Sequence, residues 1–103
     1  MLPSVTKADF KTEVLDSPIP VIVDFWAAWC NPCRALAPIL EQLAQESGGA
    51  FKIVKVDTDG STDLASEYGI SALPTVKVFK NGKVTNTGVG LMNKDRVKQL
   101  LVD

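Results

Sequence analysis

The sequence contains no histidine and only two cysteines. The absence of histidine excludes the Ser-His and Cys-His nucleophile systems and removes the usual ligands of catalytic zinc. Two cysteines are too few for the disulfide framework of a small secreted domain. They are also too few for a zinc site built from thiolates, which needs about four ligands. Any cysteine chemistry in this chain therefore involves this single pair.

Long apolar runs and clusters of like charge are also missing. No apolar run approaches the roughly 18 residues that a membrane-spanning helix needs, and the opening "MLPSVTKADF" lacks the apolar segment of a secretory signal. The 11 basic and 12 acidic residues nearly balance and are scattered along the chain. We therefore expect no nucleic acid and no membrane among the partners, and we expect a cytoplasmic protein.

The hydrophobic pattern alternates between short strands and helices along a chain of 103 residues. We expect strands over residues 20–26, 51–57, 75–80 and 83–89, and helices over about 6–15, 31–47, 61–68 and 93–102. A strand, a helix and a second strand with short links predict a parallel crossover, whereas Asn81-Gly82 predicts an antiparallel hairpin. The sequence thus predicts one α/β domain over residues 1–103, expected to be monomeric, with a mixed sheet and helices on both sides.

Both cysteines lie where the first strand gives way to a helix, in the order Cys30-Asn31-Pro32-Cys33. Reactive sites of open sheets collect beyond the carboxyl ends of strands. Unpaired amides and the positive end of the helix dipole favour a thiolate on Cys30, while Cys33 lies one turn further in and should keep its proton. We therefore expect Cys30 to attack a disulfide and Cys33 to resolve the mixed disulfide. The alternatives are half of a zinc site and two core cysteines without a role.

A carboxylate, Asp24, stands in the middle of the apolar run "VIVDFW". On a strand period of two, helices should cover the face on which it lies, and burial would raise its pKa. Near the inner sulfur, it could accept the proton of Cys33 during resolution. The alternatives are a solvated charge near the end of the strand and a buried acid paired with Lys55 on the adjoining strand. The residue spacing is compatible with all three.

Several short motifs, taken in order, resemble those of the thioredoxin family. They are "FWAAWCNPC", "KVD" at 55–57, "ISALPT" at 70–75, "FKNGKV" at 79–84 and "VG" at 89–90. Their order and spacing match over essentially the whole chain. The resemblance implies the thioredoxin fold, with a mixed sheet of about five strands flanked by four helices.

The resemblance also implies a role for individual residues. Cys30 would be the nucleophile and Cys33 the resolving thiol of a reversible Cys30–Cys33 disulfide. Asp24 would be the buried proton acceptor, with Lys55 as its neighbour. Pro74 would be a cis-proline beside the sulfurs.

A client disulfide would bind on a flat, apolar surface around the exposed sulfur. Backbone groups of the segment 73–75 would pair with an extended client peptide, as in strand addition. The residues expected to contact the substrate are Trp29, Asn31, Pro32, Leu73, Pro74, Thr75, Val89 and Gly90.

We therefore predict a protein-disulfide reductase without a cofactor or metal of its own. By resemblance, its partners are disulfide-containing client proteins and an NADPH-linked thioredoxin reductase that supplies electrons. Asn31 departs from the glycine that the family usually has between the first cysteine and the proline. Its amide could stabilise the thiolate and make the couple more oxidising, or it could face partners and alter docking. The alternatives are accordingly a thiol oxidase or isomerase, and a binding module without turnover that uses the same apolar surface.

Overall fold

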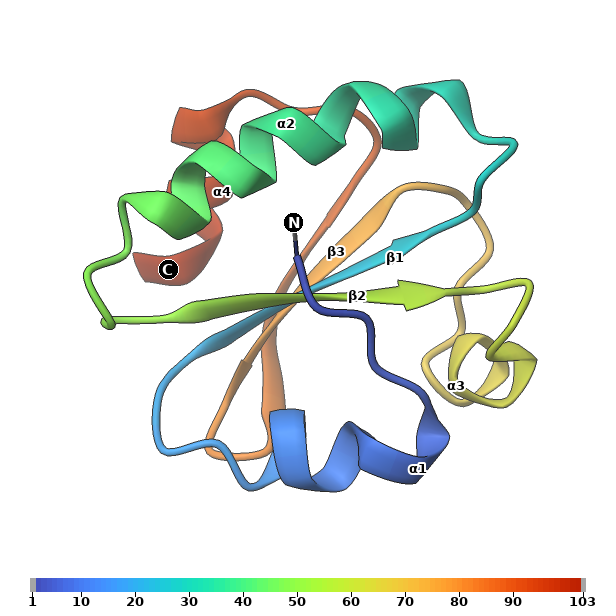
Figure 1. Ribbon diagram of the computed structural model, residues 1–103, viewed down its shortest axis with the longest axis horizontal. Coiled ribbons are helices and arrows are strands. Elements are labelled where there is room, and N and C mark those ends of the chain that lie inside the picture. Colours follow the sequence, from blue (N-terminus) through green and yellow to red (C-terminus); the bar gives the residue numbers. More distant parts are fainter. Residues whose placement is uncertain (1, 103) are drawn as a thin grey trace.

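A computed structural model describes residues 2–102 of the chain (Figure 1). Its helices and strands, in chain order, are α1 (Lys7–Phe10), the π-helical turn η1 (Lys11–Leu15), β1 (Val21–Trp26), α2 (Asn31–Gln45), β2 (Lys52–Asp57), α3 (Thr62–Glu67), β3 (Thr75–Lys80), β4 (Lys83–Val89) and α4 (Lys94–Val102). They form a mixed sheet in the order β2-β1-β3-β4. The predicted parallel pairing of β1 with β2 is confirmed, and β3 runs antiparallel to both β1 and β4.

Within the described residues the sheet has four strands, so the expectation of about five was too high. The segment 3–5 makes only an isolated parallel bridge, between Ser4 and Lys55. The main-chain N–H and C=O of Lys55 bond this segment at 2.8 and 2.9 Å. The ladder stops there because α1 begins at once, where the Asp9 carboxylate accepts a hydrogen bond of 2.7 Å from the Thr6 N–H.

Two helices cover each face of the sheet, with α2 and α4 on one face and α1 and α3 on the other (Figure 1). Successive residues of β1 point to opposite faces, so Ile22 packs beneath α2 and α4 while Val21 and Val23 pack toward α1 and α3. Both faces of β1 are covered, which explains why its sequence is a nearly continuous apolar run. The α2–α4 side is filled mainly by Ile22, Leu36, Leu40, Leu43, Ile53, Val76, Val78, Val97 and Leu100.

The hairpin between β3 and β4 turns at Asn81 and Gly82, as predicted. Their φ angles are 54° and 79°, the left-handed values that a two-residue hairpin loop requires. Further along β4, Gly88 lies against α4. A Cβ there would lie 3.0 Å from side-chain atoms of both Leu100 and Met92, so a larger residue at this position would require both side chains to shift.

The carboxyl ends of β1 and β2 and the amino end of β3 meet on the right-hand side of Figure 1. Three connections therefore converge at this end of the sheet: residues 27–30 before α2, residues 58–61 before α3, and residues 68–74 before β3. The cysteines lie in the first of these connections and at the start of α2.

Candidate redox site

The two cysteines form a disulfide at the amino end of α2, with their Cα atoms 5.3 Å apart. Cys30 is the N-cap residue, and its Sγ accepts a hydrogen bond of 3.2 Å from the main-chain N–H of Cys33. Pro32 lies in the first turn, where a missing N–H costs nothing. Only 5% of Cys30 and 1% of Cys33 is exposed.

The charge at this end of α2 favours an anionic sulfur. The helix has 15 residues, and its first turn contains no acidic side chain. The positive end of its dipole and the Cys33 N–H therefore face Cys30 Sγ without a competing carboxylate. A thiolate formed at Cys30 on reduction would be stabilised by the same groups.

Asp24 is buried at the centre of β1, with 1% of its surface exposed. It lies opposite Lys55 of β2 and Val76 of β3. Burial raises the pKa of the Asp24 carboxyl to about 7, and the nearby Lys55 charge opposes this increase. Its Oδ1 has no hydrogen-bond partner among the described residues. A carboxyl with these properties can exchange a proton near neutral pH.

Lys55 forms no ion pair with Asp24 within residues 2–102; its Nζ lies 4.3 Å from the centre of the Trp26 ring. This is the distance of a cation–π contact. Trp26 lies two residues from Asp24 on the same face of β1 and packs against the cysteines. Its buried Nε1 also lacks a partner among the described residues. β1 thus carries two buried polar atoms without a hydrogen-bond partner among the described residues, two positions apart in the chain.

The segment before β3 borders the disulfide. The Leu73–Pro74 peptide bond is cis, and Leu73 packs against the cysteines. The Thr75 hydroxyl donates a hydrogen bond of 2.6 Å to the Ala72 carbonyl. The Pro74 carbonyl accepts one of 2.8 Å from the Gly90 N–H. This bond joins the end of β4 to the cis-proline segment, in which Pro74 and Thr75 are buried and Leu73 is half-buried.

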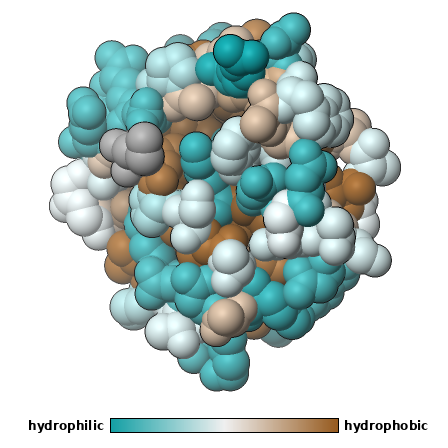
Figure 2. Space-filling view, turned by 45° about the vertical axis from the view of Figure 1, so that its right-hand side comes forward, coloured by the Kyte–Doolittle hydropathy of each residue, from teal (hydrophilic) through white to brown (hydrophobic). Residues whose placement is uncertain are grey.

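Exposed apolar side chains lie at this end of the sheet, where the end of β4 pairs with the start of β3. Trp29 is 69% exposed, Val89 61% and Leu91 54%. Figure 2, which brings this end forward, shows hydrophobic surface between hydrophilic side chains. The Trp29 Nε1–H donates a hydrogen bond of 2.9 Å to Asp59 Oδ2. Two residues at this surface were not predicted from the sequence. Leu91 directly follows the predicted pair 89–90, and Asp59 is 30 residues from Trp29 and carries no local signal.

Asn31 and Arg34 lie on the first turn of α2, and both are exposed. The side chains of Asn31 and Arg34 form no hydrogen bond or ion pair with residues 2–102. The Asn31 amide therefore donates no hydrogen bond to Cys30 Sγ in the disulfide form.

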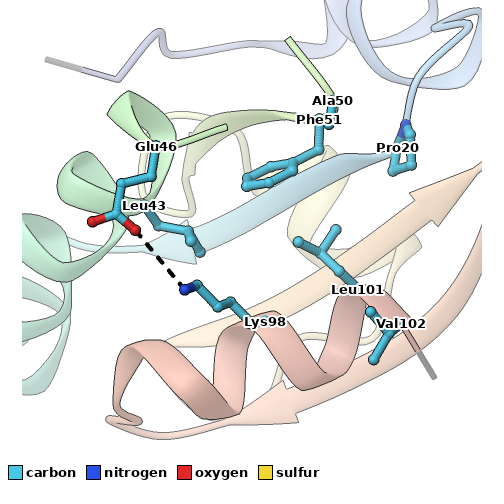
Figure 3. A pocket seen from close by; sticks show the side chains of 8 residues that line it. All are labelled: Pro20, Leu43, Glu46, Ala50, Phe51, Lys98, Leu101 and Val102. Carbon is cyan, nitrogen blue, oxygen red and sulfur yellow. Dashed lines mark ion pairs between the residues drawn. The ribbon is translucent and has the colours of Figure 1, made fainter. Parts of the chain in front are cut away.

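A separate pocket of about 370 Å³ lies at the opposite end of the sheet, between the ends of α2 and α4 (Figure 3). An ion pair of 3.9 Å between Lys98 and Glu46 crosses its edge. Its lining residues are Pro20, Leu43, Glu46, Ala50, Phe51, Lys98, Leu101 and Val102. None of them belongs to the cysteine site, so this pocket plays no part in the geometry described above.

No cluster of three or more histidine, cysteine or acidic side chains within residues 2–102 could hold a metal ion. Over the same residues, every helix is too short or too polar to cross a membrane.

A redox-capable cysteine pair at a helix amino terminus, beyond the end of a central strand, defines a thiol–disulfide oxidoreductase. The sequence model of the Thioredoxin family matches residues 1–103. Among curated proteins, the chain is 48% identical over 97 residues to "Thioredoxin 1" of Nostoc sp., an alignment that covers 94% of this chain and 91% of that protein. It is 45% identical over 95 residues to "Thioredoxin" of Rickettsia felis, with 92% and 90% covered. The chain belongs to the thioredoxin family and is a protein-disulfide reductase.

Proposed function

We propose that Cys30 is the attacking sulfur and Cys33 the resolving sulfur in the reduction of client disulfides. The observation that carries this assignment is the position of Cys30 at the amino end of α2, where the Cys33 N–H bonds its Sγ at 3.2 Å. The dipole and this amide stabilise negative charge on Cys30 rather than on Cys33, which lies within the helix.

The exchange proceeds in two steps that together move two electrons to the client. The Cys30 thiolate attacks one client sulfur, so that a mixed disulfide forms and the first client thiolate leaves. Cys33 then loses its proton and attacks Cys30 Sγ. The mixed disulfide breaks, the second client thiolate leaves, and the Cys30–Cys33 disulfide remains.

Asp24 is the proposed acceptor of the Cys33 proton. A carboxyl with a pKa of about 7 takes up and releases a proton readily near neutral pH. Its burial and its unpaired Oδ1 support this role. Lys55 would adjust the pKa of Asp24 through its charge while held over the Trp26 ring.

The client is proposed to bind as an extended peptide along the segment 73–75, between Trp29 on one side and Val89 and Gly90 on the other. Exposed apolar side chains at Trp29 and Val89 support this surface. The remaining proposed contacts to the client are Asn31 and Pro32, both exposed on the first turn of α2.

The family implies a reductase-type partner that returns electrons to the disulfide. We propose that this partner is an NADPH-linked flavoprotein, and that the chain acts in the cytoplasm as a monomeric single domain. NADPH consumption, measured with such a reductase and a client disulfide, should depend on this protein. Sedimentation at micromolar concentration should give the mass of one chain.

Two single substitutions test the roles of the sulfurs. Cys30→Ser should reduce a protein disulfide no faster than the dithiol used as electron source. Cys33→Ser is the matched control: it keeps the attacking sulfur, and without added dithiol it should accumulate a mixed disulfide with the client. Trapping through Cys33 in the Cys30→Ser variant would reverse the assignment.

Asp24→Asn tests the proton acceptor. We expect the first attack, measured by the appearance of the mixed disulfide, to keep its rate. Release of the second client thiol at pH 7 should slow by about a hundredfold or more, as is typical when general base catalysis is lost. An unchanged rate of release would leave Asp24 without a catalytic role.

A further inference from the structure

The first turn of α2 carries a cation beside the sulfurs that nothing else in the described chain neutralises. Arg34 is exposed and has no hydrogen-bond or ion-pair partner for its side chain among residues 2–102. We infer that Arg34 selects clients that carry an aspartate or glutamate next to the disulfide cysteine that is attacked. This inference rests on the proposed function, because it concerns which disulfides reach Cys30.

Helix geometry places Arg34 next to the attacking sulfur. Its main-chain N–H donates a hydrogen bond of 3.2 Å to the Cys30 carbonyl, so it lies one turn beyond the N-cap. It is three residues beyond Asn31, and residues at this spacing are neighbours on a helix surface. Side chains in a helix lean toward its amino end. The Arg34 guanidinium therefore covers surface beside Cys30 and Asn31.

The local charges leave this cation open to an acidic partner. The first turn of α2 has no acidic residue, and the first one along the helix is Glu41, about two turns beyond Arg34. The carboxylate at the other side of the site, Asp59, is bonded to Trp29. Two sides of the docking surface thus differ in charge: Arg34 and the helix dipole make the α2 side positive, whereas Asp59 makes the side next to β2 negative.

The chemistry of these groups defines the client that fits. A guanidinium can bind a carboxylate through two parallel hydrogen bonds, which an amide or a lysine on the client cannot reproduce. Asn31, also without a side-chain partner among the described residues, offers one neutral donor and one acceptor to the client backbone. An acidic side chain that faces α2 gains a contact, and one that faces Asp59 does not.

The test uses disulfide-linked peptides that differ only in one residue beside the attacked cysteine: glutamate, glutamine or lysine, placed before it in one set and after it in another. The varied residue faces α2 in only one of these two sets. In that set, kcat/KM should be about two- to fivefold higher for glutamate than for lysine, which is the range of an exposed ion pair. The preference should shrink as salt is added, because exposed charges are screened. In Arg34→Gln it should vanish, and in Arg34→Glu it should reverse.

Arg96→Gln is the matched control, since Arg96 is an exposed arginine of α4 outside the site, and it should keep the preference. Equal rates for glutamate and lysine peptides in both sets would overturn the inference, as would a preference that survives in Arg34→Gln. Neither result would contradict the proposed function, which predicts only that Arg34→Gln still reduces the glutamine peptide. Failure of that function would instead show as reduction by Cys30→Ser at the wild-type rate.

Discussion

The buried Asp24 carboxyl should make the stability of the oxidised protein depend on pH in a way that one substitution removes. Burial raises its pKa from 3.8 to about 7, so the folded chain holds this proton more tightly than the unfolded chain does. Stability therefore falls as the pH rises from about 4 through about 7, and it levels off above. The sign is opposite to that of an acid stabilised by an ion pair.

The size of the effect follows from the two pKa values. A difference between 3.8 and about 7 corresponds to about 4 kcal/mol of unfolding free energy between the protonated and ionised limits. Asp24→Asn removes the ionised form. The stability of this variant relative to the wild type should therefore rise by about 3 kcal/mol from pH 5 to pH 9, the part of the change that lies above pH 5.

Urea unfolding of both oxidised proteins at pH 5, 7 and 9 measures this difference directly. The other titrations of the protein are common to both and cancel. Asp95→Asn, at an exposed position of α4, is the matched control and should show a constant difference from the wild type. A difference between wild type and Asp24→Asn that stays constant over this range would refute the reasoning, because it would mean that the folded protein does not perturb the carboxyl.

Two further substitutions test the packing and the docking surface. Gly88→Ala should lower the unfolding free energy by about 1–3 kcal/mol, measured by urea unfolding, because the new Cβ would push aside Leu100 and Met92; unchanged stability would show that both side chains yield freely. Asp59→Ala removes the acceptor that holds Trp29, and it should lower kcat/KM for protein disulfides by about two- to tenfold while the urea midpoint stays nearly constant. An equal loss of stability and activity would contradict a role in docking.

The sheet could be predicted because its signals are local. The run "VIVDFW" has the β-branched, apolar composition of a strand covered on both faces, and this is how β1 is packed. Asn81 and Gly82 tolerate the positive φ angles that the hairpin needs. The number of strands was harder to predict. The segment 3–5 forms only an isolated bridge, because the hydrogen bond from the Thr6 N–H to Asp9 starts α1 directly after it.

The site could be predicted only in part. The positions of Cys30 and Cys33 at the start of a helix follow from the spacing and from Pro32. The bond between Trp29 and Asp59 could not be predicted, because it joins two connections that only the folded sheet brings together. The sequence also predicted that Lys55 lies near Asp24, and the two residues are opposite each other in β1 and β2. The contact of Lys55 with the Trp26 ring could not be predicted, because it depends on the orientation of both side chains.

Burial of both sulfurs in the disulfide form has a consequence for how electrons return to this protein. With 5% of Cys30 and 1% of Cys33 exposed, a freely diffusing thiol meets little exposed surface of either cysteine. A macromolecular donor that binds Trp29 and Val89 is held beside the disulfide and gains a large advantage in effective concentration. The fold thereby favours reduction of the disulfide by a docked protein over reduction by a small thiol at the same concentration.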